Sequence, residues 1–384
     1  EVLKMYITDS ELRGFDSYKY SCKDTSPLSV YVMHPFWNQA VKVFPRWVAP
    51  NLMTFAGFVL LICQYILLWY YDPTYKASTD DPNFPNIPTW VWWVSFFAQF
   101  FSHTLDGCDG KQARRTGTSS PLGELFDHGI DSWCVSLFTL NILSVFGRKL
   151  APIELMYSVQ CITLMAFALS HWEKYNTGIL FLPWAYDLSQ VLMALVYLIT
   201  AIAGVDIWDQ NILGFPINFW FKCILYVASF AFALPMSLYN IYMAYKNGTG
   251  KNLSLYESCV PLFSPILSLI IFTTWKIVSP SNIIYTNPRI FMLIISVVFS
   301  NFLCRLIVSQ MSNTRCQVIN AFVVITGACL AATIFFNDPT IESHISIALA
   351  LILTLAHVHY GIVVVNKLAD HFGIKVFSIK QRSD

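Results

Sequence analysis

Residues 52–71 read LMTFAGFVLLICQYILLWYY, a run of twenty residues without a charged side chain. An α-helix of about 20 mainly apolar residues is long enough to cross the hydrocarbon core of a bilayer. The run therefore predicts a membrane-spanning helix, and its character is repeated along the chain.

The composition excludes several classes of protein. Of the 384 residues, 55% are hydrophobic and only 12% are charged, whereas soluble proteins carry about 25% charged residues. A soluble globular enzyme, a disordered chain and a nucleic-acid-binding protein are therefore excluded. The net charge of +1 also gives no field that would attract polyanions.

Nine further apolar runs follow the first one, and turn-forming residues such as Asp72-Pro73 and Asn337-Asp338-Pro339 separate them. These runs are 89–105, 128–147, 154–171, 186–204, 217–243, 256–277, 290–311, 317–336 and 343–366. We therefore predict an all-α integral membrane protein, a polytopic bundle of about ten transmembrane helices.

The chain is expected to have three parts. Residues 1–51 form an N-terminal segment, 52–366 the ten-helix domain and 367–384 a tail. Within the first part, residues 34–47 (HPFWNQAVKVFPRW) mix aromatic and basic side chains just before the first span. We predict a short interfacial helix that lies on the membrane surface; the alternative is an ordinary loop with a Trp/Arg anchor.

The distribution of lysine and arginine predicts the orientation. With an even number of spans, both termini lie on one side, where the loops and termini hold 17 Lys and Arg against 5 in the opposite loops. Because loops rich in these residues stay in the cytosol, we expect the N-terminal segment and the tail to be cytosolic.

Acidic residues gather between the second and third spans. Residues 106–115 read DGCDGKQARR and residues 123–131 read GELFDHGID. Asp106 and Asp109 are three apart, and Asp127 and Asp131 are four apart, so each pair shares one face of a helix. Two antiparallel helices would bring all four together. Ionisable groups at membrane depth are costly and are candidates for function.

Four carboxylates in one small volume repel one another unless divalent cations bind them. Mg²⁺ or Mn²⁺ prefers carboxylate oxygen and keeps other positions for substrate phosphate. Gly110 lets a ligand approach closely, while Arg114 and Lys111 suit phosphate oxygens. The pattern indicates two-metal chemistry on a pyrophosphate with a lipid as second substrate. The competing interpretation is that the aspartates cap helices.

The spacing Asp106-x2-Asp109-Gly110-x2-Ala113-Arg114-x8-Gly123-x3-Asp127-x3-Asp131 resembles the signature of the CDP-alcohol phosphotransferase family, with all eight fixed positions present. The resemblance implies a helical membrane enzyme whose four aspartates bind two divalent metals, with its catalytic core at about 52–245. Such enzymes move a phosphoalcohol from a CDP-activated donor to an acceptor alcohol and release CMP.

The resemblance extends to the eukaryotic choline/ethanolamine branch of the family. It is carried by His128 next to Asp127, by residues 49–51 (APN), and by the stretches 170–178 (SHWEKYNTG) and 182–187 (LPWAYD). It implies transfer from CDP-ethanolamine to 1,2-diacylglycerol in the membrane of the endoplasmic reticulum or Golgi, with the active site facing the cytosol. A choline or dual-specificity enzyme is the alternative. Homodimers are common in the family.

Three residues are expected to have particular roles. His128 is the preferred acceptor of the hydroxyl proton, because an imidazole titrates near working pH while a metal-bound Asp131 is a weak base. The alternative is that His128 only donates a hydrogen bond. Asn51 resembles a position that contacts the nucleotide, although it could equally cap the first span. Glu173 is a candidate to bind the ammonium head group.

Two other classes of protein compete with an enzyme. A transporter would distribute its charges along a path through the membrane, whereas here the acidic residues gather once, at one membrane face. A non-catalytic scaffold gives no reason for four aspartates to face one another.

Overall fold

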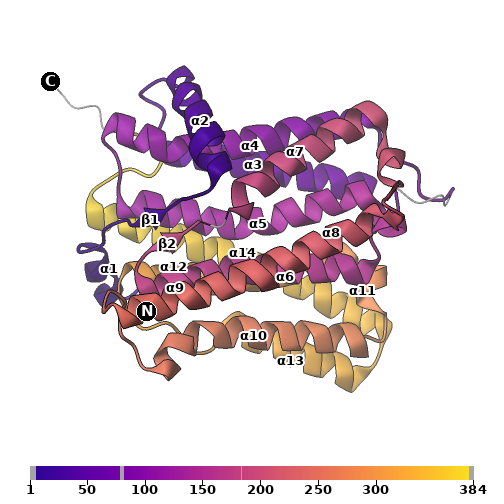
Figure 1. Ribbon diagram of the computed structural model, residues 1–384. Coiled ribbons are helices and arrows are strands. Elements are labelled where there is room, and N and C mark those ends of the chain that lie inside the picture. The colour runs from indigo at the N-terminus through magenta and orange to yellow at the C-terminus, as the bar shows by residue number, and fades with distance from the viewer. Residues whose placement is uncertain (1–5, 78–81, 183, 380–384) are drawn as a thin grey trace.

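The computed structural model describes residues 6–77, 82–182 and 184–379; the outermost residues of the predicted N-terminal segment and tail, 1–5 and 380–384, lie outside this range. Long helices run back and forth along one axis to form a bundle (Figure 1). They are α3 (Pro50–Tyr71), α4 (Thr89–Thr116), α5 (Pro121–Leu150), α6 (Ile153–Thr177), α7 (Ala185–Ala203), α8 (Ile217–Tyr226) with η5 (Val227–Ala233) and α9 (Leu234–Lys246), α10 (Leu255–Val278), α12 (Pro288–Met311), α13 (Ala321–Phe336) and α14 (Pro339–Phe372).

The prediction of an all-α polytopic membrane protein is confirmed. Within the described ranges, eight helices are long and apolar enough to cross a membrane. The two other predicted spans correspond to α13, which has 16 residues, and to α4, whose apolar part continues into charged residues as far as Thr116. Ten runs of sequence therefore become ten long helical segments, although two of them do not have the length or composition of an ordinary span.

The predicted interfacial helix is present as a helical segment from Ser29 to Val43. It comprises η2 (Ser29–Met33), α2 (His34–Ala40) and η3 (Val41–Val43), so the alternative of an ordinary loop is wrong for most of this stretch. Figure 1 shows α2 crossing over α4 at one end of the bundle. That α2 lies on a membrane surface stays a prediction.

Both ends of the described chain lie at this same end of the bundle. Helix α1 (Asp9–Phe15) contacts the end of α14, where His371 Nε2 lies 2.7 Å from Asp16 Oδ1. Strand β1 (Cys22–Lys23) then pairs in parallel with β2 (Leu180–Phe181), which follows α6; Cys22 is opposite Leu180. The N-terminal segment is thereby attached to the bundle at two places.

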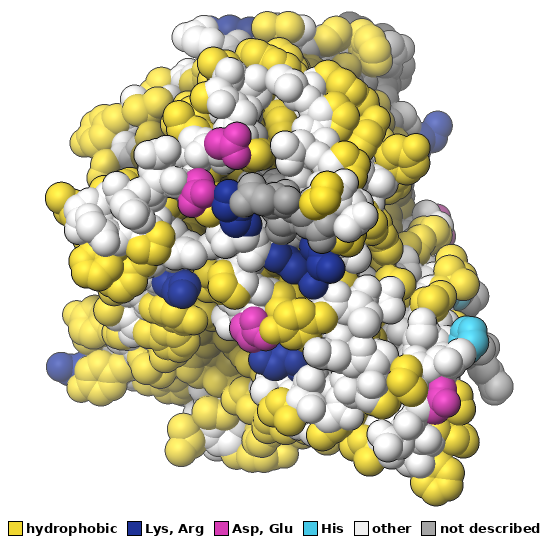
Figure 2. Space-filling model, turned by 90° about the vertical axis from the view of Figure 1, so that its right-hand side faces the viewer, with side chains coloured by type: hydrophobic (Ala, Val, Ile, Leu, Met, Phe, Trp, Pro, Cys, Tyr) yellow, Lys and Arg dark blue, Asp and Glu magenta, His cyan; other side chains and the backbone are white. Residues whose placement is uncertain are grey.

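The other end of the bundle carries the short elements η4 (Val205–Trp208), β3 (Asn211–Ile212), β4 (Phe215–Pro216) and α11 (Ile283–Thr286). Figure 2 shows this end, with a few charged side chains among hydrophobic ones. Arg289 is one of the five Lys and Arg residues that were counted in the loops at this end, but it belongs to α12 and its side chain is 1% exposed. Lys174 is one of the 17 that were counted in the loops and termini at the opposite end, but it is buried in α6. Without these two, the count of Lys and Arg is 16 against 4, so the predicted bias persists.

Burial differs greatly between helices. Helix α12 lies at the centre, where it packs against α5, α6 and α14. In an 18-residue apolar stretch of this helix, 83% is buried inside the protein. In the corresponding stretch of the span formed by α8, η5 and α9, the buried share is 6%, and only Ser237 and Ile241 are buried in these three elements. The core of the protein therefore lies around α12 and α5, and the α8–α9 span is peripheral.

Candidate active site

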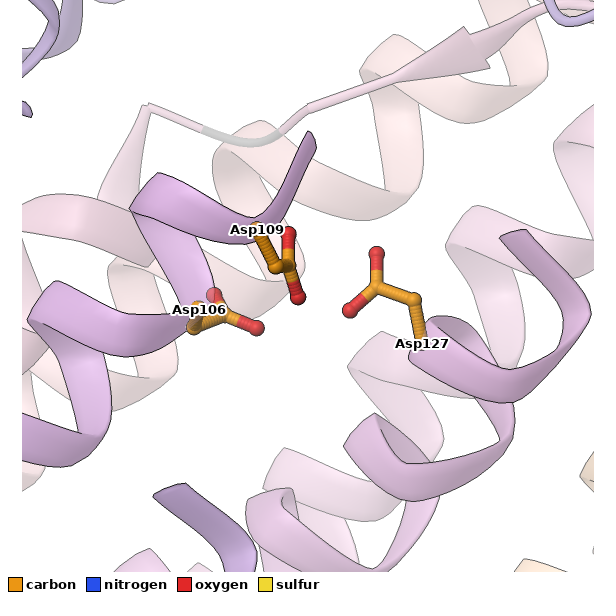
Figure 3. Close-up of side chains that lie close together, drawn as sticks. All are labelled: Asp106, Asp109 and Asp127. Carbon is orange, nitrogen blue, oxygen red and sulfur yellow. The ribbon is translucent and has the colours of Figure 1, made fainter. Parts of the chain in front are cut away.

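Three aspartates of the motif meet between α4 and α5. One carboxylate oxygen of each of Asp106, Asp109 and Asp127 lies within 4.8 Å of the others. Figure 3 shows Asp127 reaching toward the other two from the opposite helix. The chain reverses in between because Gly117 ends α4 in the left-handed conformation and the Ser120 side chain caps α5. This reversal turns the two acidic helix faces toward each other.

The fourth aspartate, Asp131, lies one turn further along α5. It is outside the 4.8 Å cluster, but together with Asp106 it lines a small cavity between α3, α4, α5 and α7. Phe58 and Phe138 form part of the same wall. The cavity therefore connects the acidic cluster with the apolar interior of the bundle.

None of the four aspartates caps a helix. Asp106 and Asp109 lie well inside α4, and Asp127 and Asp131 lie in the second and third turns of α5. The capping interpretation of the motif is therefore wrong.

Hydrogen bonds fix two of the carboxylates and leave a third with an unpaired oxygen. Thr54 Oγ1 donates to Asp109 Oδ2 at 2.5 Å, and Tyr186 OH donates to Asp106 Oδ2 at 3.2 Å. Asp127 Oδ1 is buried and has no hydrogen-bond partner within the described chain. A buried, unpaired oxygen beside two further carboxylates fits a site for a divalent cation, which would give that oxygen a partner.

The glycine at position 107 serves the protein itself. A Cβ atom there would overlap the indole ring of Trp37, so α2 can approach α4 only at a glycine. Lys111 Nζ donates to Asn38 Oδ1 at 2.9 Å, and Arg115 Nη1 donates to two backbone carbonyl groups at the end of the same segment, at 2.8 Å each. Lys111, expected to contact phosphate, thus has a partner on α2.

Arg114 is exposed and makes no hydrogen bond or ion pair with any described residue. It lies one turn after Gly110, and no side chain separates the two: a Cβ atom on Gly110 would meet only the guanidinium, at 3.6 Å. The forked donor group of Arg114 is therefore available to a ligand beside the aspartates.

Asn51 does not cap the first span, because Ala49 occupies the N-cap position of α3 without a side-chain hydrogen bond. The amide of Asn51 instead donates to the carbonyl of Val376 at 3.0 Å. Its Oδ1 atom would lie 3.5 Å from a Cβ atom on Gly123. The side chain thus sits beside the start of α5, which carries two of the aspartates.

His128 is buried in α5 directly after Asp127. Its Nδ1 atom lies 3.8 Å from Glu124 Oε1 and forms no hydrogen bond with the residues that the structure describes. The ring faces His171 of α6, with 5.6 Å between centroids, and Tyr20 of the N-terminal segment, at 6.4 Å. No hydrogen bond joins His128 to Asp131 in the described part of the chain. The imidazole is therefore enclosed on three sides by polar and aromatic groups.

Glu173 also belongs to α6, but it lies on the face of this helix that contacts α9 rather than on the face that carries His171. Its two carboxylate oxygens accept hydrogen bonds from Ser237 Oγ at 2.6 Å and Asn240 Nδ2 at 2.7 Å, both on α9. The structure thus shows Glu173 joining α6 to α9. Its contact with a head group stays a prediction.

Three residues at the site were not expected from the sequence. Glu124 could have been found, because it precedes His128 by four residues and so shares its helix face. Thr54 and Tyr186 come from other helices, and nothing in the local sequence indicates that they reach the aspartates.

Comparison with known proteins identifies the family to which the chain belongs. Residues 47–239 match the CDP-alcohol phosphatidyltransferase family, and the chain belongs to it. It is therefore a membrane-bound transferase of substituted phosphate groups, in a family that depends on divalent metal ions and uses CDP-alcohols.

The relatives cover nearly the whole chain. It is 47% identical to human ethanolaminephosphotransferase 1 over 98% of this chain and 95% of the relative. Cholinephosphotransferase 1 of Danio rerio is 30% identical, over 96% of this chain and 94% of the relative. Choline/ethanolaminephosphotransferase 1 of Arabidopsis thaliana is 28% identical, over 98% and 99%.

Proposed function

We propose that this protein is an ethanolaminephosphotransferase that transfers phosphoethanolamine from CDP-ethanolamine to 1,2-diacylglycerol, giving phosphatidylethanolamine and CMP. The observation that carries the proposal is the 47% identity to ethanolaminephosphotransferase 1, which extends over 98% of the chain and so includes the whole acidic site. The Danio rerio and Arabidopsis thaliana relatives are named as a choline and a choline/ethanolamine enzyme, so a choline or dual activity is the second candidate.

The acidic cluster fits divalent metal ions. Asp106, Asp109 and Asp127 would hold one ion, and Asp131 would share a second with Asp106 through the cavity that both line. Oxygen-only donors suit Mg²⁺ or Mn²⁺. When bound, the ions neutralise the charge that develops on the pyrophosphate during displacement.

The CDP-alcohol is proposed to lie beside the acidic cluster, over the end of α4 and the start of α5. Arg114, which has no partner among the described residues, would bind phosphate oxygens through its guanidinium, and Gly110 would leave room beside it. Asn51, beside Gly123, is placed to contact the nucleotide. Lys111 would contribute its charge while it stays bound to Asn38.

His128 is proposed to take the proton of the acceptor hydroxyl, through its Nε2 atom. The Glu124 carboxylate, 3.8 Å from Nδ1, would accept a hydrogen bond from Nδ1–H as the ring moves and so fix the neutral tautomer with Nε2 free. The acceptor oxygen then bonds to the phosphorus that carries ethanolamine. The bond from that phosphorus to the bridging oxygen breaks, and CMP leaves with the bridging oxygen. Asp131 is the alternative base.

The surroundings of the site suit a lipid acceptor. Phe58 and Phe138 form part of the wall of the cavity beside Asp106 and Asp131, so apolar side chains lie next to the aspartates, which supports an acceptor with an apolar part. The excess of Lys and Arg at the end that carries the aspartates supports an active site facing the cytosol. We further propose the endoplasmic reticulum or Golgi as the location and a homodimer as the assembly.

One assay tests the proposal. The purified protein is given CDP-ethanolamine, diacylglycerol and Mg²⁺ or Mn²⁺, with and without a chelator, and CMP release is measured. We expect metal-dependent CMP release and a labelled phosphatidylethanolamine product. A parallel reaction with CDP-choline decides between the two candidates. Absence of metal-dependent CMP release with every CDP-alcohol would refute the enzyme proposal, and a clear preference for CDP-choline would refute the head group.

A further inference from the structure

A buried lysine lies next to the proposed base and has no role in the chemistry described so far. The side chain of Lys174, in the last turn of α6, is 2% exposed. Its Nζ atom donates to Glu124 Oε1 at 2.7 Å. Burial of an ammonium group is costly unless it is paired, so the Glu124 carboxylate is what makes the buried position of Lys174 tolerable.

Two tyrosines of the N-terminal segment enclose this ion pair. The Lys174 ammonium lies 5.6 Å from the ring centroids of both Tyr18 and Tyr20, within the range of cation–π attraction. The pairing of β1 with β2, directly after α6, holds this part of the N-terminal segment in place and lies at the same end of the bundle as α2 (Figure 1).

Tyr18 also binds the carboxylate that Lys174 binds. Its hydroxyl donates to Glu124 Oε1 at 2.5 Å. Burial and the neighbouring Glu124 carboxylate raise the pKa of Tyr18 well above its ordinary value, so the phenol keeps its proton and remains a donor. The pKa of Tyr20 is raised in the same direction, chiefly by burial.

One oxygen atom therefore connects the N-terminal segment, α6 and the proposed base. Glu124 Oε1 accepts from Tyr18 and Lys174 and is the carboxylate oxygen that lies 3.8 Å from His128 Nδ1. A glutamate side chain has three rotatable bonds, and each unrestrained bond spreads its position. With two strong donors on the same atom, the carboxylate is held close to the imidazole before substrate binds.

We propose that Lys174, assisted by Tyr18, is a positioning residue for catalysis: it holds the Glu124 carboxylate where that carboxylate can orient the His128 imidazole. The inference rests on the proposed role of His128. Lys174 itself touches neither the aspartates nor the atoms that react. Its effect is expected on turnover rather than on the binding of the CDP-alcohol.

The test is steady-state kinetics of full-length Lys174→Met, Lys174→Arg and Tyr18→Phe with CDP-ethanolamine and diacylglycerol. Loss of an orienting partner costs roughly 10- to 100-fold in activity, so we expect Lys174→Met to lower kcat by about that factor. The KM for CDP-ethanolamine should stay within about threefold, because the phosphate-binding residues are untouched. Lys174→Arg keeps the charge, so its kcat should lie between the values for Lys174→Met and the wild type. Tyr18→Phe removes one of the two donors to Glu124, so its kcat should also be intermediate.

Lys251→Met is the matched control. Lys251 is also a partly buried lysine at this end of the bundle, with its ammonium 4.7 Å from the centroid of the Tyr175 ring, but it does not contact Glu124. Its replacement should leave kcat unchanged. Lys174→Met leaves the Glu124 carboxylate without its cationic partner, with Tyr18 as the remaining donor, and could fail to fold. Lys174→Arg and Tyr18→Phe then carry the test, since both keep a cation beside Glu124.

A double-mutant cycle separates positioning from stability. If Lys174 acts through Glu124, then Lys174→Met should change kcat by less than about threefold when Glu124 is already glutamine, because the two residues act as a unit. Wild-type kcat in folded Lys174→Met, or a full additional loss in the Glu124→Gln background, would refute the inference. Either result leaves the proposed function intact if the wild type releases CMP, whereas a wild type without CMP release refutes the proposed function itself.

Discussion

The hydroxyl of Thr54 on α3 donates a 2.5 Å hydrogen bond to Asp109 on α4, across 55 residues of sequence. The bond holds one oxygen of a proposed metal ligand in a fixed direction. It ties the geometry of the acidic cluster to the first membrane-spanning helix.

Replacement of Thr54 by valine should weaken metal binding, because Asp109 loses its orienting donor while the volume of the side chain is kept. We expect the Mg²⁺ concentration that gives half-maximal CMP release to rise by about tenfold. The measurement is a Mg²⁺ titration followed both by CMP release and by Tm. Thr54→Ser keeps the hydroxyl and should behave like the wild type; equal titrations for valine and serine would contradict the assigned role of Thr54.

Divalent metal should stabilise the protein, since it removes the repulsion among Asp106, Asp109 and Asp127. At a concentration 100 times the Kd, a ligand adds about 2.7 kcal/mol to the free energy of unfolding, which a rise in Tm after metal is added to chelated protein would show. Asp127→Asn should lose this rise and more than about 100-fold in activity. Without metal it should be more stable than the wild type, because one of the crowded charges is gone. A metal-dependent rise in Tm that survives Asp127→Asn would count against the site.

Replacement of His128 by alanine should remove the proton acceptor. General-base catalysis contributes roughly 10²- to 10⁴-fold, so kcat at saturating CDP-ethanolamine should fall by at least about 100-fold. His359→Ala is the control, since His359 is exposed and lies 3.1 Å from the Tyr6 hydroxyl, near the chain termini. Near-normal turnover in His128→Ala would exclude His128 as the base and would favour Asp131.

A side chain at position 107 should displace α2. In Gly107→Ala the new Cβ atom overlaps the Trp37 ring, and overpacking of this kind costs about 1–3 kcal/mol. We expect a lower Tm in detergent. Gly361→Ala is the matched change, because it is also in a helix and a Cβ atom there meets nothing within 4 Å; its Tm should be unchanged or higher. Equal Tm values for the two variants would show that Trp37 can move away freely.

Glu173 distinguishes two interpretations of one carboxylate. If it binds the ammonium group, Glu173→Gln should lose the preference for CDP-ethanolamine over CDP-choline, measured as the ratio of kcat/KM values. If it only joins α6 to α9, Glu173→Gln and Asn240→Ala should both lower Tm and leave that ratio unchanged. An unchanged ratio therefore refutes the head-group role.

The sequence was sufficient for the parts of the structure that depend on local pattern. The apolar runs predicted the long helices, and the spacing of Asp106, Asp109, Asp127 and Asp131 predicted two acidic helix faces that meet. The spacing did not show that three of the carboxylates form one cluster while Asp131 faces the cavity. That difference follows from the angle and separation of α4 and α5, which no sequence period specifies.

The contacts that are distant in sequence were not predictable. Lys174 follows an apolar run and resembles an exposed cation at a membrane face, yet α6 continues to Thr177 and the N-terminal tyrosines cover it. Arg289 was misplaced in the same way, since its partners lie in other parts of the chain: its Nε atom donates to the carbonyl of Asp72 at 2.7 Å and its Nη2 atom to Ser144 Oγ at 2.6 Å. A charged residue beside an apolar run is ambiguous until its partners are known.

The contrast in burial between α12 and the α8–α9 span has an evolutionary consequence. Where 83% of a helix window is enclosed, each side chain must match the volume of the space around it. Where 6% is enclosed, any apolar side chain serves, whatever its size or branching. Among homologues, the side chains of α12 should therefore keep their size and shape. In the α8–α9 span, apolar positions should vary among Leu, Ile, Val and Phe, and only the polar residues that bind Glu173 should be conserved.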